Sequence, residues 1–188
     1  SQFLRMFECQ KAAFSLSPST CYLASCGRTP LPTASCAAGK AELELKLTSP
    51  SLVSGSHHSR DVKSKVAQLL GGSPLNVCLC PSTSYAATLA AALMDTPQRR
   101  VIVFQDEIDS IVLAFQRQCK ALHVLPNHGQ RQLQELLEAE GPDSDLTLCV
   151  THVFWTKGWV MFDLKETLQR CADKGIPIFM DLTQSLGV

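Results

Sequence analysis

The chain has 188 residues, and its 17 Lys and Arg balance its 17 Asp and Glu, so the formal net charge is zero. Zero net charge removes the electrostatic argument for nucleic acid or an anionic membrane surface as the main partner. Hydrophobic residues make up 45% and charged residues 18% of the sequence, which excludes the polar, highly charged class of disordered chains. The longest apolar run, 86–94, is far shorter than the roughly 18 residues of a membrane span. We expect one globular domain, or part of a larger one, with no nucleic-acid or membrane partner.

Nine cysteines are spread along the chain. None forms a CxxC pair or groups with histidine at zinc-ligand spacing, so no metal site is predicted. Disulfide scaffolds are usually much smaller, and the first residues lack the apolar core of a secretory signal. These features favour a reduced, cytoplasmic protein in which Cys78 and Cys80 are core thiols on one face of a strand. Because the sequence does not begin with Met, we also expect a fragment.

The sequence divides into two regions that differ in composition and in the periodicity of their apolar residues. Residues 1–59 are rich in Ser, Pro, Thr and Cys and show few periodic stretches, so we expect an N-terminal segment there. In 60–188, helical spacing of apolar residues predicts helices over Arg60–Leu70, Thr83–Met94, Ile108–Gln118, Gln130–Glu140 and Asp163–Lys174. Short apolar runs predict strands over Asn76–Cys80, Arg100–Phe104, Ala121–Leu125, Leu146–Val153 and Ile176–Asp181.

Strands that are almost continuously apolar, and are joined by helices, indicate a parallel sheet buried on both faces. The sequence therefore predicts the α/β class, as a three-layer α/β/α structure with a mostly parallel sheet. In an open sheet of this kind, ligands bind beyond the carboxyl ends of the strands. We expect the functional residues to follow the predicted strands.

Two positions at that edge are candidates for binding a ligand. The turn Pro81-Ser82-Thr83-Ser84-Tyr85 opens a helix, and its N–H groups and hydroxyls suit a phosphate. An ordinary Ser/Thr helix cap explains the same residues, and is the commoner outcome. Asp181 ends the last strand, where a partly buried carboxylate needs a metal, a protonated ring nitrogen or a basic side chain as its partner. A cap of a following helix explains Asp181 equally well. Gln184 lies three residues later.

Two further segments end strands on the same side. The first holds His152 and Trp155, and the second holds Asp106, Glu107 and Asp109. A single histidine at a strand end is usually hydrogen-bonded rather than metal-bound. Glu107 and Asp109 are expected to diverge on a helix, so they do not predict an acid–base pair.

Four segments, in chain order, resemble the class V aminotransferase family. They are Tyr22–Pro32 (YLASCGRTPLP), Pro81–Ala86 (PSTSYA), Thr151–Gly158 (THVFWTKG) and Asp181–Gly187 (DLTQSLG). This family comprises fold-type I pyridoxal 5'-phosphate (PLP) enzymes, among them cysteine desulfurases, kynureninase and isopenicillin-N epimerase-like proteins. The likeness extends over nearly the whole chain, and the last segment is the most specific.

The resemblance implies PLP as the cofactor and an amino acid or amine as the substrate. Thr83 and Ser84 would hold the cofactor phosphate. Asp181 would pair with the pyridine nitrogen, so that the ring acts as an electron sink. Gln184 would bind near the phenolic oxygen of the ring, and His152 would line the pocket beside the cofactor.

The resemblance also implies how the rest of the chain contributes. Arg28 and Trp155 would line the substrate pocket, with Arg28 in a substrate-side loop of the segment 1–59. Residues 60–188 would form a PLP-binding large domain that is incomplete at its C-terminus. The full-length protein is expected to be a homodimer.

Two features depart from the family pattern. Glu107 is followed by Ile108, where the family often has a histidine or an aromatic residue that stacks on the PLP ring. The lysine that forms the Schiff base is expected one strand beyond Asp181, and no lysine of this chain occupies that place. The chain as given is therefore expected to be inactive.

Two other interpretations remain. The first is a non-catalytic PLP-fold relative that serves as a binding or scaffold protein. The second, ranked behind it, is an unrelated nucleotide or flavin binder, for which the G-x-G-x-x-G fingerprint is missing.

Overall fold

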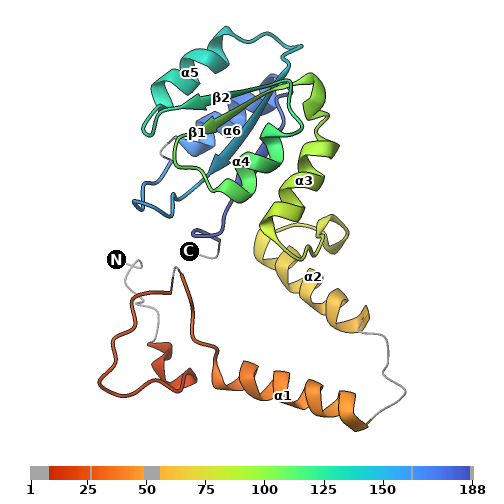
Figure 1. Ribbon diagram of the computed structural model, residues 1–188, viewed down its shortest axis with the longest axis vertical. Coiled ribbons are helices and arrows are strands. Elements are labelled where there is room, and N and C mark those ends of the chain that lie inside the picture. Colours follow the sequence, from red (N-terminus) through yellow and green to blue (C-terminus); the bar gives the residue numbers. More distant parts are fainter. Residues whose placement is uncertain (1–8, 26, 49–55, 162, 187–188) are drawn as a thin grey trace. The chain divides into compact units, whose positions relative to one another are not determined.

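The computed structural model describes residues 9–25, 27–48, 56–161 and 163–186, and Figure 1 shows how its elements are arranged within each part. The chain forms two compact units, Ser1–Val66 and Ala67–Val188. The first unit contains a 3-10 turn, η1 (Gln10–Ala13), the helix α1 (Thr33–Thr48) and most of α2 (Ser56–Leu70). The assignment of 1–59 and 60–188 as functional parts stays a prediction.

Helix α1 was not predicted. Its leucines at 43, 45 and 47 alternate with charged residues and are exposed, so they form no one-sided apolar stripe. The helix contains Ala, Glu, Leu and Lys throughout, and these residues have high intrinsic helix propensity. Propensity, rather than the apolar periodicity used for the prediction, explains this helix.

The second unit contains a four-stranded parallel sheet. Its strands are β1 (Arg100–Phe104), β2 (Ala121–Leu125), β3 (Leu146–Thr151) and β4 (Ile178–Asp181), in the spatial order β2-β1-β3-β4. In register, Arg100 lies opposite Ala121 on one side and Leu146 on the other, and Thr151 lies opposite Asp181. These pairings confirm the predicted parallel α/β sheet.

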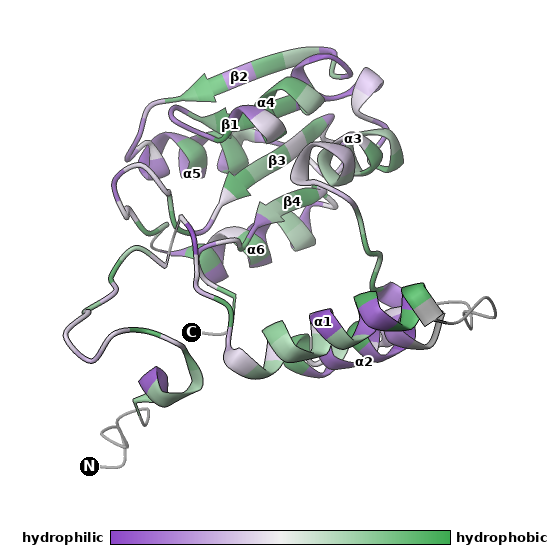
Figure 2. Ribbon diagram, turned by 60° about the horizontal axis from the view of Figure 1, so that its bottom comes forward, coloured by the Kyte–Doolittle hydropathy of each residue, from purple (hydrophilic) through white to green (hydrophobic). Residues whose placement is uncertain are grey.

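Helices cover both faces of this sheet. Alternation along β1 directs Val101 and Val103 to one face, where they pack with residues of α3 (Thr83–Leu93) and α4 (Asp109–Gln116). Ile102 and Phe104 face the other side and pack with residues of α5 (Gln130–Ala139) and α6 (Leu164–Asp173). In Figure 2 the strands are mostly green, α3 is green to pale, and α5 and α6 carry purple segments. The three-layer α/β/α prediction is confirmed.

The predicted strand over Asn76–Cys80 is wrong. The 3-10 turn η2 (Pro74–Asn76) occupies its start, and the residues after it pair with no strand. Leu75 is 94% exposed and Cys78 is exposed, so this apolar run has no sheet neighbour to bury it. The prediction that Cys78 and Cys80 are core thiols is therefore also wrong. Among the cysteines that the structure describes, the buried thiols are Cys149 in β3 and Cys171 in α6.

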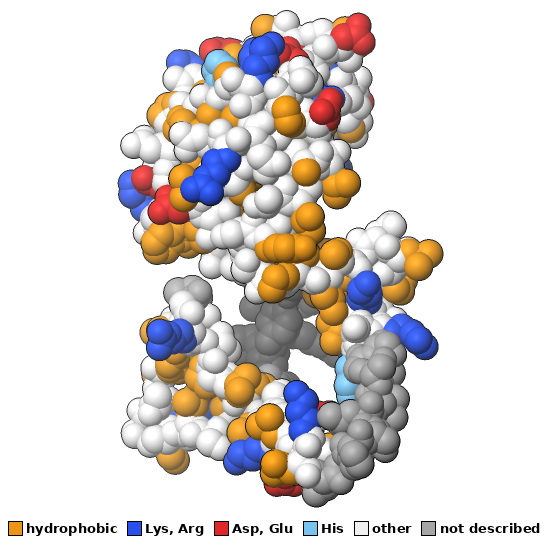
Figure 3. All heavy atoms as spheres, turned by 45° about the vertical axis from the view of Figure 1, so that its right-hand side comes forward, with side chains coloured by type: hydrophobic (Ala, Val, Ile, Leu, Met, Phe, Trp, Pro, Cys, Tyr) orange, Lys and Arg blue, Asp and Glu red, His pale blue; other side chains and the backbone are white. Residues whose placement is uncertain are grey.

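Charges of both signs are interspersed on the face of the α/β unit that Figure 3 shows. This distribution agrees with the zero net charge. Within the described ranges, no helix is both long and apolar enough to cross a membrane.

Candidate functional site

The N-terminus of α3 and the carboxyl ends of the strands lie toward the same edge of the unit. A 3-10 turn, η3 (Thr96–Gln98), follows α3 and leads into the start of β1. There Thr96 Oγ1 donates to Ala91 O at 2.9 Å, and Lys120 N, just before β2, donates to Thr96 O at 3.2 Å. The C-terminus of α3 is thus fixed at the amino ends of the strands. Because an 11-residue helix and a five-residue strand each span about 16 Å, the first turn of α3 lies level with the carboxyl edge.

Asp181 ends β4 on the face of the sheet that α3 and α4 cover. Phe179, two residues earlier, packs against their cluster, and strand alternation places Asp181 on the same side. Asp181 Oδ1 accepts a hydrogen bond from Thr183 N at 2.8 Å and another from Thr183 Oγ1. Asp181 therefore caps the turn that follows β4; the described residues after β4 form a turn rather than the helix that the capping alternative predicted. All of these bonds go to Oδ1, so the turn fixes the direction of the carboxylate and leaves Oδ2 for another partner.

Glu107 is a second carboxyl group at this edge, and the sequence did not reveal it as a site residue. It is only 8% exposed. Its Oε1 accepts hydrogen bonds from Thr151 Oγ1 and from Ile108 N, the latter at 3.1 Å, while Oε2 is buried without a hydrogen-bond partner. Burial raises the pKa of Glu107; the hydrogen bonds from Thr151 and Ile108 oppose this shift, and the charge of Asp181 adds to it.

Neither carboxyl group has a protein counter-ion in the part of the chain that the structure describes. Among the described residues, no Lys, Arg or His forms an ion pair with Glu107 or Asp181. Cys149 lies buried on the same face of β3, and its pKa is raised well above the usual value, first by burial and then by Glu107 and Asp181. A cationic group bound at this edge would favour the ionised form of these carboxyl groups.

The first turn of α3 forms an ordinary N-cap. Ser82 Oγ accepts from Tyr85 N at 3.2 Å, which is the capping alternative that the sequence left open. Thr83 and Ser84 are exposed. No hydrogen bond within the described part of the chain links either residue to Asp181, so their role in holding a phosphate stays a prediction.

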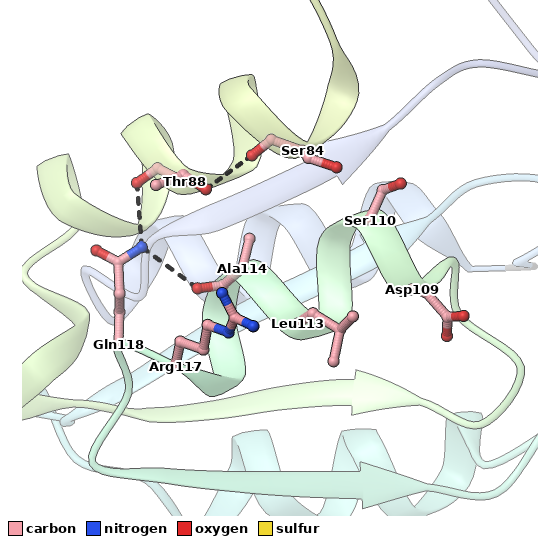
Figure 4. A pocket seen from close by; sticks show the side chains of 8 residues that line it. All are labelled: Ser84, Thr88, Asp109, Ser110, Leu113, Ala114, Arg117 and Gln118. Carbon is pink, nitrogen blue, oxygen red and sulfur yellow. Dashed lines mark hydrogen bonds between the residues drawn. The ribbon is translucent and has the colours of Figure 1, made fainter.

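Ser84 also lines a pocket of about 510 Å³ between α3 and α4 (Figure 4). Gln118 closes one end of the pocket, because its side chain donates to Thr88 O and Ala114 O, both at 3.3 Å. Arg117 and Asp109 also line this space, and so bring charges of opposite sign to it. The pocket contains none of the residues predicted to hold the ring of the cofactor.

The other predicted residues lie in different environments. The half-buried His152 donates its backbone N–H to Asp181 O at 3.0 Å, and Gln184 is half-buried in the turn after β4. Trp155 is 63% exposed. Arg28 is exposed in the N-terminal unit, where its carbonyl accepts from the Tyr22 hydroxyl. The chain thus brings His152, Asp181 and Gln184 to one edge. The motif residues Cys26 and Gly187 lie outside the described residues.

Trp159, rather than the exposed Trp155, packs against other aromatic rings near this edge. The chain turns back after β3, with Phe154 N donating to Trp159 O at 2.8 Å. The Trp159 ring lies 4.7 Å from that of Phe154 and 5.0 Å from that of His128. The family-like spacing singled out Trp155, whereas the return of the chain at Gly158, with φ of 62°, is what positions Trp159.

The donor set suits a protonated organic group better than a metal ion. Among the residues that the structure describes, no three His, Cys, Asp or Glu side chains form a group that could hold a metal. Two buried polar atoms at this edge have no hydrogen-bond partner among the described residues: Oε2 of Glu107 and Oγ of Ser185. A bound ligand would supply hydrogen bonds to them. PLP, with a protonated ring nitrogen and hydrogen-bonding oxygens, fits this set.

Comparison of the sequence with family models and with curated proteins finds no significant match. Solved structures do match. A serine palmitoyltransferase from S. paucimobilis, a lysine-to-alanine variant with a bound PLP–myriocin aldimine, superposes with a TM-score of 0.58 at 18% identity, over 79% of this chain and 39% of that one. The Sphingomonas wittichii enzyme gives 0.57 at 17%, over 78% and 37%. A structure described as SPT with PLP internal aldimine gives 0.55 at 20%, over the same shares.

These matches establish the fold. The chain spans under two-fifths of the length of each neighbour. The narrower likeness to class V aminotransferases stays a prediction. The chain shares the α/β fold of the matching part of these PLP-bound serine palmitoyltransferase structures.

Proposed function

We propose that the α/β unit binds PLP at the carboxyl edge of its sheet and belongs to a PLP-dependent enzyme that acts on an amino acid or amine. One observation carries the proposal. Two carboxyl groups, on Glu107 and Asp181, lie on the α3-covered face, and no basic side chain of the described residues forms an ion pair with either. The fold shared with PLP-bound structures supports the same cofactor.

Each residue has a definite task in this proposal. Asp181, held by Thr183, keeps a proton on the ring nitrogen. Thr83, Ser84 and the free N–H groups of the first turn of α3 bind the phosphate. Gln184 binds near the phenolic oxygen, and His152 lines the pocket.

Ile108 packs on the α3–α4 cluster, on the same face as Asp181. We propose that Ile108 covers the ring where the related family often stacks a histidine or an aromatic residue. When bound, PLP supplies an electron sink for chemistry at the α-carbon of an amine. Class V membership, a homodimer, and substrate contacts through Arg28 and Trp155 belong to the same proposal.

The binding test compares PLP with pyridoxal, which lacks the phosphate. Titration of the chain with PLP, followed by tryptophan fluorescence and calorimetry, should show saturable binding. Asp181→Asn should weaken it at least about tenfold, equivalent to about 1.4 kcal/mol. Asp143→Asn, at an exposed loop position, is the matched control and should leave binding unchanged. Failure of PLP to bind, or equal losses in the two variants, would sink the proposal.

The phosphate contacts are tested separately. Thr83→Ala and Ser84→Ala should weaken PLP binding but leave pyridoxal binding nearly unchanged, because only PLP carries the anion. Equal effects on both ligands would contradict a phosphate role for the α3 turn.

We further propose that no lysine within residues 1–188 forms a Schiff base with PLP, because none of them matches the place of the Schiff-base lysine. Lys157 is the most informative one to check, because its Nζ lies 3.6 Å from Asp106 Oδ2 at the same edge. Borohydride reduction of the loaded chain, followed by peptide mass mapping, should find no lysine modified in proportion to the bound cofactor. Stoichiometric modification of Lys157 would overturn this part of the proposal.

A further inference from the structure

Glu107 is held in place more firmly than a surface carboxylate. It follows β1 after Asp106, whose φ of 63° turns the chain, and Glu107 N donates to Phe104 O at 3.3 Å. Two hydrogen bonds then fix Oε1, one from the end of β3 and one from the residue that precedes α4. These contacts hold a carboxyl group, 8% exposed, between three elements of the fold.

The surroundings of Glu107 are acidic or apolar. Asp181 faces it from β4, Thr151 and Cys149 face it from β3, and Ile108 adjoins it before α4. Asp106 and Asp109 flank it in the sequence. No basic side chain of the described residues pairs with it. A negative charge on Glu107 is unfavourable in such surroundings, because burial and then the charge of Asp181 oppose it.

The two carboxyl groups differ in their surroundings. Asp181 is half-exposed and accepts two hydrogen bonds on Oδ1. Glu107 is buried, and its Oε2 has no donor to stabilise a negative charge. Burial therefore favours the protonated form of Glu107.

We propose that Glu107 is a positioning residue of the cofactor site, which holds a proton at neutral pH and so leaves Asp181 as the single ionised carboxyl group. This inference rests on the proposed function only where it concerns the ring nitrogen. A single negative charge matches one protonated ring nitrogen, whereas two ionised carboxylates would also attract divalent cations.

The proton can be observed directly. The 188-residue chain, labelled with carbon-13 at the glutamate carboxyl carbon, is titrated by NMR, and Glu107→Gln assigns the resonance. We expect this resonance to titrate at higher pH than the other glutamates. Asp181→Asn should lower its midpoint by removing the neighbouring charge, and Asp143→Asn should not move it. Titration of Glu107 together with the exposed glutamates would overturn the proposal.

PLP binding gives a second readout. A glutamine mimics a neutral carboxyl group, so Glu107→Gln should bind PLP within about twofold of the unmodified chain at neutral pH, while Asp181→Asn should not. An equal loss in both variants would show that Glu107 acts as an anion. If neither the unmodified chain nor any variant binds PLP, the proposed function fails. The NMR titration still shows whether Glu107 is protonated at neutral pH. Should Glu107→Gln not fold, Thr151→Val identifies the resonance instead, because loss of its hydrogen bond raises the midpoint.

Discussion

Thr151 donates a hydroxyl hydrogen bond to Glu107 across the carboxyl ends of β3 and β1. Thr151 is also the in-register partner of Asp181 on the neighbouring strand. One buried threonine, 3% exposed, therefore binds Glu107 through its hydroxyl and lies in register with Asp181. Because β3 pairs with β4, the position of Thr151 is fixed by the sheet, and its hydroxyl anchors Glu107, which lies in the loop after β1.

Replacing Thr151 by valine should destabilise the protein. Valine keeps the shape of the side chain but leaves Oε1 of a buried carboxyl group with one donor fewer, and such a loss costs about 1–3 kcal/mol. Urea unfolding at neutral pH, with one fitted slope for both proteins, measures the difference.

Thr147→Val is the matched control for that experiment. Thr147 lies in the same strand, on the same face, and is fully buried, but its Oγ1 has no hydrogen-bond partner. Valine removes an unsatisfied hydroxyl there, so the free energy of unfolding should stay the same or rise by up to about 1 kcal/mol. Equal destabilisation by the two variants would mean that the hydrogen bond to Glu107 contributes nothing.

The sheet could be predicted from sequence because its four strands are nearly continuous apolar runs between amphipathic helices. The same rule failed at Asn76–Cys80, since an apolar run becomes a strand only when a neighbour pairs with it. Asp181 was found because it directly ends a strand. Glu107 was not, because its burial depends on the positive φ of Asp106 and on Thr151, some 44 positions later in the chain. Periodicity contains no information on either contact.

Ser82 and Thr83 should affect stability and binding in opposite order. Ser82 caps α3, so Ser82→Ala should lower the free energy of unfolding by about 0.5–2 kcal/mol. Thr83 is exposed, so Thr83→Ala should change it by less than about 0.5 kcal/mol. For PLP affinity the proposal predicts the larger loss at Thr83. Thermal unfolding and PLP titration of both variants test this. If the same variant shows the larger loss in both stability and PLP affinity, Ser82 and Thr83 do not have the separate roles of helix cap and phosphate ligand.

Asp106 joins the loops that follow β1, β2 and β3. Its Oδ2 accepts from Asn127 Nδ2 at 2.6 Å and lies 3.6 Å from Lys157 Nζ, and its φ of 63° is in the left-handed region. Asparagine tolerates that region, but alanine is strained there by roughly 1–2 kcal/mol. We therefore expect Asp106→Ala to destabilise the protein more than Asp106→Asn in chemical denaturation. Asp106→Gly, which relieves the strain but loses both contacts, separates the two causes and should fall between them.

Asp145 should make stability depend on pH at the opposite end of the sheet. The Arg100 guanidinium lies 2.6 Å from Asp145 Oδ1 and 3.0 Å from Glu140, and Lys120 lies 3.3 Å from Asp145 Oδ2. Arg100 first, and then Lys120, lower the pKa of Asp145. Because the folded state lowers this pKa, the stabilisation is present above the ordinary range of an aspartate and is lost as the pH falls through the folded value.

Asp145→Asn should therefore be less stable than the unmodified chain at neutral pH, and the difference should vanish in acid. Urea unfolding across the acid range measures this, and added salt should reduce the difference at neutral pH because the pair is partly exposed. Glu135→Gln is the control, since its 3.5 Å contact with Arg131 is exposed and should contribute almost nothing. A difference for Asp145→Asn that persists unchanged in strong acid would show that Asp145 acts by packing rather than by its charge.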